Sequence, residues 1–145
     1  TRLIGGKTDI VMMLNGALAG LVAITAEPLT PGPITAMFIG SIGAVIMYFG
    51  TKMLESYGLD DVVGAIPVHM FAGIFGTLVV PLTNSDTTFG TQFIGTASVC
   101  LFSFGLSWIT FTILKSTIGL RISKAAEKLG TDKAEVGVTA YSIRD

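Results

Sequence analysis

The stretch "VVGAIPVHMFAGIFGTLVVPLTNS" (residues 62–85) decides the fold, because it contains no Asp, Glu, Lys or Arg and its single ionisable side chain is that of His69. A membrane-spanning helix needs about 17–25 predominantly apolar residues, and this stretch is long enough for one. The same four residue types are missing from residues 10–26, 28–51 and 87–114. The sequence therefore predicts four transmembrane helices.

The low content of charged residues supports this interpretation. Only 13% of the residues are charged, whereas a soluble globular domain carries about 25%. The alternative is a large soluble core, but a chain of 145 residues cannot hide four uniformly apolar helices from water. We therefore expect an all-α, polytopic membrane protein with residues 1–118 in the membrane part and 119–145 as a soluble tail. The expected spans are about 10–26, 34–51, 62–82 and 93–114.

The nine Lys and Arg residues predict the orientation of the spans. If successive loops alternate between the two sides, all nine lie on one side, in the N-terminal segment, the loop 52–61 and the tail. Lys and Arg are enriched on the cytoplasmic side of membrane proteins. We therefore expect a cell (inner) membrane protein with both ends of this segment in the cytoplasm, and with external turns at 27–33 and 83–92.

Metal-binding residues do not form a recognisable pattern. His69 and Cys100 are the single residues of their types, and an ordinary zinc site needs several such ligands. We therefore expect no metal and no cofactor. The net charge of −1 gives no indication of a nucleic-acid partner.

Small residues recur four positions apart within the predicted spans. In lipid, such residues let two helix backbones approach closely, and this close packing holds membrane helices together. We expect a tightly packed bundle around the pairs Gly16–Gly20, Gly40–Ala44 and Ala72–Gly76.

His69 is the leading candidate for a functional side chain. It lies about 10 Å along the helix axis from Val62, where a charged side chain is costly and the neutral imidazole is favoured. The neutral ring has one donor and one acceptor nitrogen, so it can hydrogen-bond a small polar molecule or relay a proton. Pro67 is expected to bend the helix beside it. On an ideal helix His69 shares one face with the small residues Ala65, Ala72, Gly73 and Gly76.

Two other interpretations of His69 stay open. The imidazole can be a structural group that hydrogen-bonds to a neighbouring helix. It can also be an axial haem ligand, although a second ligand would be needed and the chain has no other histidine.

Three motifs in order carry a resemblance to a known family. They are "LNGALAGLVAIT" (14–25), "DDVVGAIPVHMFAGIFGTL" (60–78) and "GLRISKAAEKLGTDKAEVGVTAY" (119–141). Together they resemble the C-terminal part of the Amt/Mep/Rh ammonium transporter family, bacterial Amt type. The resemblance implies a homotrimer with one pore per subunit, eleven membrane helices per subunit in two inverted repeats, and a transporter instead of an enzyme. It also implies that the four spans correspond to helices eight to eleven.

The resemblance also implies a role for His69. In the family, two histidines face each other in a narrow hydrophobic pore, where ammonium gives up its proton and crosses as ammonia. His69 matches the second histidine, and Ala65 is expected to line the same lumen. Met70 stands where many members have Gly, and we expect it to alter packing and leave the pore intact.

The tail carries a second set of candidate residues. "SKAAEKLG" (123–130) predicts a short helix that ends at a glycine C-cap. The family's tail contacts the cytoplasmic face of the subunits and docks PII-type signalling proteins, and Val136 departs from the Glu-His-Gly of many members. The tail residues that fit the family are Gly130, Asp132, Glu135, Gly137, Ala140 and Tyr141.

The first pore histidine of the family, its external ammonium site and its phenylalanine gate have no counterpart in these residues. We therefore expect the chain to be the C-terminal segment of an ammonium transporter, or to need helices from another chain. The alternatives are an ammonium-sensing relative of the transporter fold and a non-conducting membrane fragment.

Overall fold

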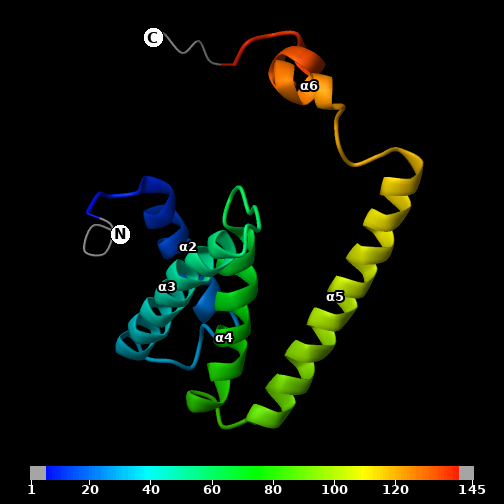
Figure 1. Ribbon diagram of the computed structural model, residues 1–145. Helices are drawn as coiled ribbons and strands as arrows, with labels where there is room; N and C mark the ends of the chain where they lie inside the picture. The colour runs from blue at the N-terminus through cyan, green and yellow to red at the C-terminus, as the bar shows by residue number, and fades with distance from the viewer. Residues whose placement is uncertain (1–5, 141–145) are drawn as a thin grey trace. The chain divides into compact units, whose positions relative to one another are not determined.

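The computed structural model describes residues 6–140, and the part that it describes is helical, with no β-strand (Figure 1). The chain divides into two units, residues 1–99 and residues 100–145. The long helix α5 (Phe89–Thr117) runs from the first unit into the second. The all-α class predicted from the sequence is thus confirmed for the described residues.

The first unit is built from α2 (Ile10–Thr25), α3 (Pro33–Ser56) and a third helical run. In that run the π-helical turn η1 (Ile66–Phe71) leads into α4 (Ala72–Val79) and the 3₁₀ turn η2 (Val80–Leu82). In Figure 1 the three helical segments lie against one another, and each packs on the other two.

Small residues make the closest contacts between these segments, as the sequence predicts. A Cβ on Gly20 would lie 3.2 Å from the carbonyl oxygen of Gly40, so α2 and α3 meet backbone to backbone. A Cβ on Gly76 of α4 would overlap the carbonyl oxygen of Ala23 in α2. Larger residues at these positions would push the helices apart, which explains the glycines at these crossings. The buried apolar cluster beside these contacts consists of Ala19, Met47, Val68 and Ala72.

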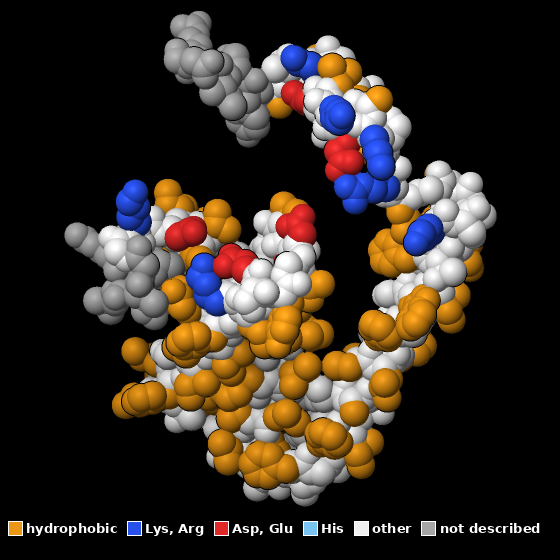
Figure 2. Space-filling view, in the orientation of Figure 1, with side chains coloured by type: hydrophobic (Ala, Val, Ile, Leu, Met, Phe, Trp, Pro, Cys, Tyr) orange, Lys and Arg blue, Asp and Glu red, His pale blue; other side chains and the backbone are white. Residues whose placement is uncertain are grey.

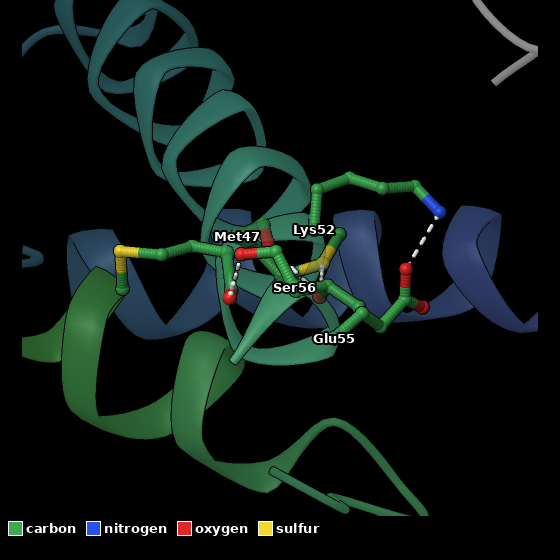
Figure 3. Close-up of polar contacts among 6 residues, drawn as sticks. Met47, Lys52, Glu55 and Ser56 are labelled. Atoms are coloured by element: carbon green, nitrogen blue, oxygen red, sulfur yellow. Dashed lines mark hydrogen bonds and ion pairs between the residues drawn. The ribbon is translucent and has the colours of Figure 1, made fainter. Parts of the chain in front are cut away.

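The helix α3 extends beyond its predicted span. The charge-free run stops before Lys52, yet the helix continues to Ser56. The Lys52 ammonium lies 2.9 Å from the Glu55 carboxylate one turn later (Figure 3), and the Ser56 hydroxyl donates to the carbonyl oxygen of Met53. Polar side chains thus finish the helix outside the apolar part.

The other helices begin and end near the predicted positions. α2 ends one residue before the predicted boundary. α5 is longer at both ends than 93–114, because polar residues continue the helix on each side of the apolar run. The third run starts at Ile66 instead of Val62, because Gly64, with φ +73°, ends a turn just before it.

Among residues 6–140, two helices, α3 and α5, are long and apolar enough to cross a membrane. The apolar helical segments Ile10–Thr25 and Ile66–Leu82 are shorter. The prediction of four spans is thus supported by length for two of them.

The second unit contains the rest of α5, the short helix α6 (Lys124–Leu129) and the π-helical turn η3 (Asp132–Val136). No residue of α5 is buried. The Ser123 hydroxyl caps the start of α6 by accepting a hydrogen bond from the backbone N–H of Ala126 at 3.2 Å. Gly130 ends α6 with φ +96°, which only glycine adopts freely, so the C-cap predicted at this residue is confirmed.

Candidate functional site

His69 lies in the wide turn η1. The backbone N–H of Ala72 reaches back to the carbonyl oxygen of Pro67, five residues earlier, and this bond defines a π-helical turn. Pro67 stands at the start of the turn and has no N–H to donate to the preceding turn. The bend that the sequence predicts at Pro67 is therefore realised as a local widening of the helix.

The Asp61 carboxylate holds the start of this turn. One of its oxygens accepts from the backbone N–H of Ala65 at 2.9 Å, and the other accepts from the N–H of Ile66 at 2.8 Å. The first N–H groups of a helix have no partner within the helix, so this carboxylate satisfies two of them. Sequence analysis did not single out Asp61, although an acidic residue shortly before a helix start is a recognised capping signal.

Asn15 ties the same region to α2. Its side-chain nitrogen donates to the carbonyl oxygen of Val63 at 3.0 Å. Gly64 follows with a positive φ, and a Cβ there would lie 2.5 Å from the Asn15 amide nitrogen. Asn15 is the single Asn or Gln within the apolar run 10–26. This isolated side-chain amide is the signal in the sequence that could have predicted the contact. Asn15 thus fixes the position of the turn that leads to Ala65 and His69.

The structure separates His69 from part of the small-residue face predicted for it. His69 and Ala65 are exposed, whereas Ala72 and Gly76 are buried against the neighbouring helices. The prediction of one shared face is wrong for these two residues, because a turn closed over five residues rotates the next part of the helix relative to an ideal one. The helical run begins at Ile66, so His69 lies three residues after its start.

The imidazole of His69 makes no hydrogen bond with any other residue that the structure describes. Its neighbours Pro67 and Val68 are buried. The interpretation of His69 as a histidine bonded to a neighbouring helix therefore finds no support among residues 6–140. Ala65 lies four residues earlier, directly before η1, and is exposed too.

The turns at the other end of the three helical segments are joined by side chains. The Asn84 amide donates to a carboxylate oxygen of Glu27 at 2.7 Å, and the N–H of Leu29 donates to the other oxygen at 3.2 Å. These bonds favour the ionised carboxylate and lower the pKa of Glu27. The segment after α2 is thereby connected to the segment after η2.

In the tail, four of the predicted residues come together. The Asp132 carboxylate accepts from the backbone N–H of Ala140 at 2.8 Å, which lowers the pKa of Asp132. A Cβ on Gly130 would lie 2.6 Å from that carboxylate, and the N–H of Gly137 donates to the carbonyl oxygen of Asp132. Glu135 lies exposed on η3, and Tyr141 lies outside the described residues.

Comparison with known proteins supplies the context for these sites. The sequence model of the "Ammonium Transporter Family" matches residues 1–141. The chain is 39% identical to ammonium transporter Amt2 of Archaeoglobus fulgidus over 161 residues, which cover 97% of this chain and 34% of that protein.

Two further relatives give the same result. Identity is 34% with ammonium transporter Amt2 of Methanocaldococcus jannaschii, over 96% of this chain and 35% of that protein. It is 32% with the ammonium transporter of Corynebacterium glutamicum, over 98% of this chain and 35% of the relative. The chain spans about a third of the length of these curated relatives.

Proposed function

We propose, because the chain belongs to the Ammonium Transporter Family, that it forms one wall of a path that carries ammonium or ammonia across a membrane. In this proposal His69 and Ala65 face the path. The observation that carries the proposal is the unbonded imidazole of His69 beside exposed Ala65, on a turn whose opposite face is buried.

The chemistry of the ring suits a small nitrogen base. A neutral imidazole has one donor and one acceptor nitrogen, and ammonia has both functions too. Because His69 has no hydrogen-bond partner among the described residues, both ring nitrogens are available to a passing molecule. The methyl group of Ala65 leaves room beside the ring and adds no competing polar group. Asp61 and Asn15 position the turn without contacting the path.

The remaining features of the proposal concern the whole assembly. We infer that α2 and the run Ile66–Leu82 also cross the membrane, which makes four spans within an eleven-helix fold. Both ends of this segment then face the cytoplasm of the cell that carries the protein. The proposed assembly is a homotrimer, and the tail around Gly130, Asp132, Glu135, Gly137 and Tyr141 is the proposed contact for a PII-type protein.

Uptake of methylammonium tests the role of His69. The complete polypeptide that carries this segment is expressed in cells without ammonium transporters, as wild type and with His69→Ala, His69→Asp or Met70→Ala. A hydrogen bond contributes about 0.5–1.5 kcal/mol to a neutral partner and about 1.5–3 kcal/mol to a charged one. We therefore expect His69→Ala to lower uptake by a factor of about two to ten if the ring meets the neutral base and by more than about tenfold if it meets the cation. Met70 is exposed on the same turn, so Met70→Ala is the matched control and should retain uptake within about twofold.

The other interpretations predict different results at equal amounts of protein in the membrane. A sensor would bind ammonium, and the wild type would show no uptake. A structural histidine would leave uptake unchanged in His69→Ala, and that result would exclude the proposed path.

A further inference from the structure

The carbonyl group of Val63 is the backbone group that Pro67 leaves without a donor. In an α-helix the N–H of each residue donates to the carbonyl oxygen four positions earlier, and position 67 would serve Val63 in this way. Proline has no N–H to donate. The next pair along the chain is regular, because the N–H of Val68 donates to the carbonyl oxygen of Gly64 at 3.1 Å. The missing bond therefore lies directly before the turn that carries His69.

A side chain of α2 supplies the missing donor. The Asn15 amide nitrogen donates to the carbonyl oxygen of Val63 at 3.0 Å, across 48 positions of sequence. Figure 2 shows mainly hydrophobic side chains on the face of the first unit that is in view, with the charged ones gathered near one end. In such apolar surroundings an amide or a carbonyl group without a partner is costly. One bond thus serves both the Asn15 amide and the carbonyl group that Pro67 leaves free.

Gly64 lets the two segments approach this closely and passes the contact on toward His69. It is buried, and a Cβ there would lie 2.5 Å from the Asn15 amide nitrogen. Its carbonyl oxygen accepts the N–H of Val68, which directly precedes His69. The helical run that bears the imidazole is therefore bonded at its first turn to α2, where a regular helix would be bonded to itself.

We propose that Asn15 is a positioning residue for His69: it replaces the N–H that Pro67 lacks and thereby sets where the imidazole stands in the ammonium path. This inference rests on the function proposed above and names a further residue on which that path depends. Asn15 acts through the backbone and is assigned no contact with ammonium. The Asp61 carboxylate caps the same turn from within its own segment, so it does not fix the turn relative to α2.

Methylammonium uptake by the complete polypeptide, at equal amounts of protein in the membrane, tests the role of Asn15. Asn15→Leu nearly keeps the shape of the side chain and removes the donor. One hydrogen bond between membrane helices shifts an equilibrium about three- to seventeenfold, so we expect the maximal uptake rate to fall at least about twofold and no further than in His69→Ala. Asn84→Leu is the matched control, because it removes the amide bond to Glu27 at the other end of the helices. It should leave the maximal rate nearly unchanged.

Pro67→Ala distinguishes positioning from a general loss of stability. The N–H of the new alanine can donate to the Val63 carbonyl oxygen, so adding Asn15→Leu to Pro67→Ala should leave the maximal rate nearly as it is in Pro67→Ala alone. A second measurement does not depend on transport. His69 is the single histidine of the 145-residue chain, so NMR of its isotope-labelled imidazole in detergent micelles reports on that ring alone. Asn15→Leu should shift the imidazole signals, Asn84→Leu should not, and the shift should be smaller when Pro67→Ala is present.

The outcomes separate this inference from the proposed function. Unchanged uptake in His69→Ala would overturn both. If His69→Ala lowers uptake but Asn15→Leu changes neither uptake nor the imidazole signals, the path stands and Asn15 does not position the ring. Equal losses in Asn15→Leu with and without Pro67→Ala would mean that Asn15 acts independently of the Val63 carbonyl group. Equal losses in Asn15→Leu and Asn84→Leu would mean a general loss of stability, and either result would overturn the inference.

Discussion

Two apolar helical regions of this chain use glycine in different ways. Gly76 of α4 lies so close to α2 that a Cβ would overlap the carbonyl oxygen of Ala23, whereas no residue that the structure describes lies within 4 Å of a Cβ built on Gly105 of α5. Both glycines stand in charge-free runs, and each directly follows a phenylalanine. Composition alone therefore does not reveal which glycine is a helix contact, and the neighbouring backbone decides it.

The largest expected effect comes from adding one methyl group at each position. Gly76→Ala forces a Cβ into the backbone of α2 and should lower the free energy of unfolding by about 1–3 kcal/mol. Gly105→Ala meets no atom and exchanges glycine for a better helix former, so it should raise that free energy by up to about 1 kcal/mol. Unfolding of the 145-residue chain in mixed detergent micelles, followed by circular dichroism, measures both. Equal changes in the free energy of unfolding would show that the two glycines do not differ in their helix contacts.

A smaller effect distinguishes how the two regions begin their helices. Asp61 accepts two backbone N–H bonds at the start of η1, and Thr88 accepts one, from Thr91, at the start of α5. Loss of a cap costs about 0.5–2 kcal/mol. Asp61→Ala should fall near the upper end of that range and Thr88→Ala near the lower end, because Asp61 loses two bonds.

Amide hydrogen exchange checks this expectation. Asp61→Ala should speed exchange in η1 and in the first turn of α4, whereas Thr88→Ala should speed it only in the first turn of α5. If exchange around His69 is the same in Asp61→Ala as in the wild type, Asp61 does not hold the turn.

The smallest effect concerns pH. The bond from Asn84 lowers the folded-state pKa of Glu27 below its unfolded value. The contact therefore adds stability above the unfolded pKa, and this stability is lost as the pH falls through the folded pKa. Because Glu27 is only half-buried and lies in a turn, solvent screens the carboxylate and the change in stability is small.

An NMR titration of the carboxyl carbons tests this contact. Asn84→Ala should raise the pKa of Glu27 toward its ordinary value. It should leave the pKa of Asp132 unchanged, because the hydrogen bond that Asp132 accepts comes from the nearby backbone N–H of Ala140. A pKa of Glu27 that does not respond to Asn84→Ala would show that the two turns are not joined in solution.

Much of the fold could be predicted because the apolar runs are long and the charges lie between them. The start of α2 at Ile10 and the cap at Gly130 follow from local chemistry, and both are confirmed. The spans predicted for α3 and α5 were too short, because a charge-free run marks only the apolar part of a helix. The helix continues as long as polar side chains satisfy the backbone groups at its ends.

The surroundings of His69 could be predicted only in part. Its position beside Ala65 on an open face agrees with the ideal spacing of four residues, but the burial of Ala72 and Gly76 away from it does not. Helical spacing assumes uniform turns, and no sequence rule predicts that Pro67 starts a wide turn instead of a kink. The contact from Asn15 to Val63 joins residues 48 positions apart, which spacing along one helix cannot reveal.

The wide turn η1 acts as a one-residue insertion within an otherwise regular rod. The side of the rod that docks on α2 through Ala72 and Gly76 is rotated away from the side that displays the imidazole. Substitutions on the side that packs on α2 therefore change the stability of helix packing. Substitutions on the side of the imidazole change which molecules the helix contacts. Removing one residue from 66–71 would place the imidazole on the same side of the helix as Ala72 and Gly76. The imidazole would then face α2.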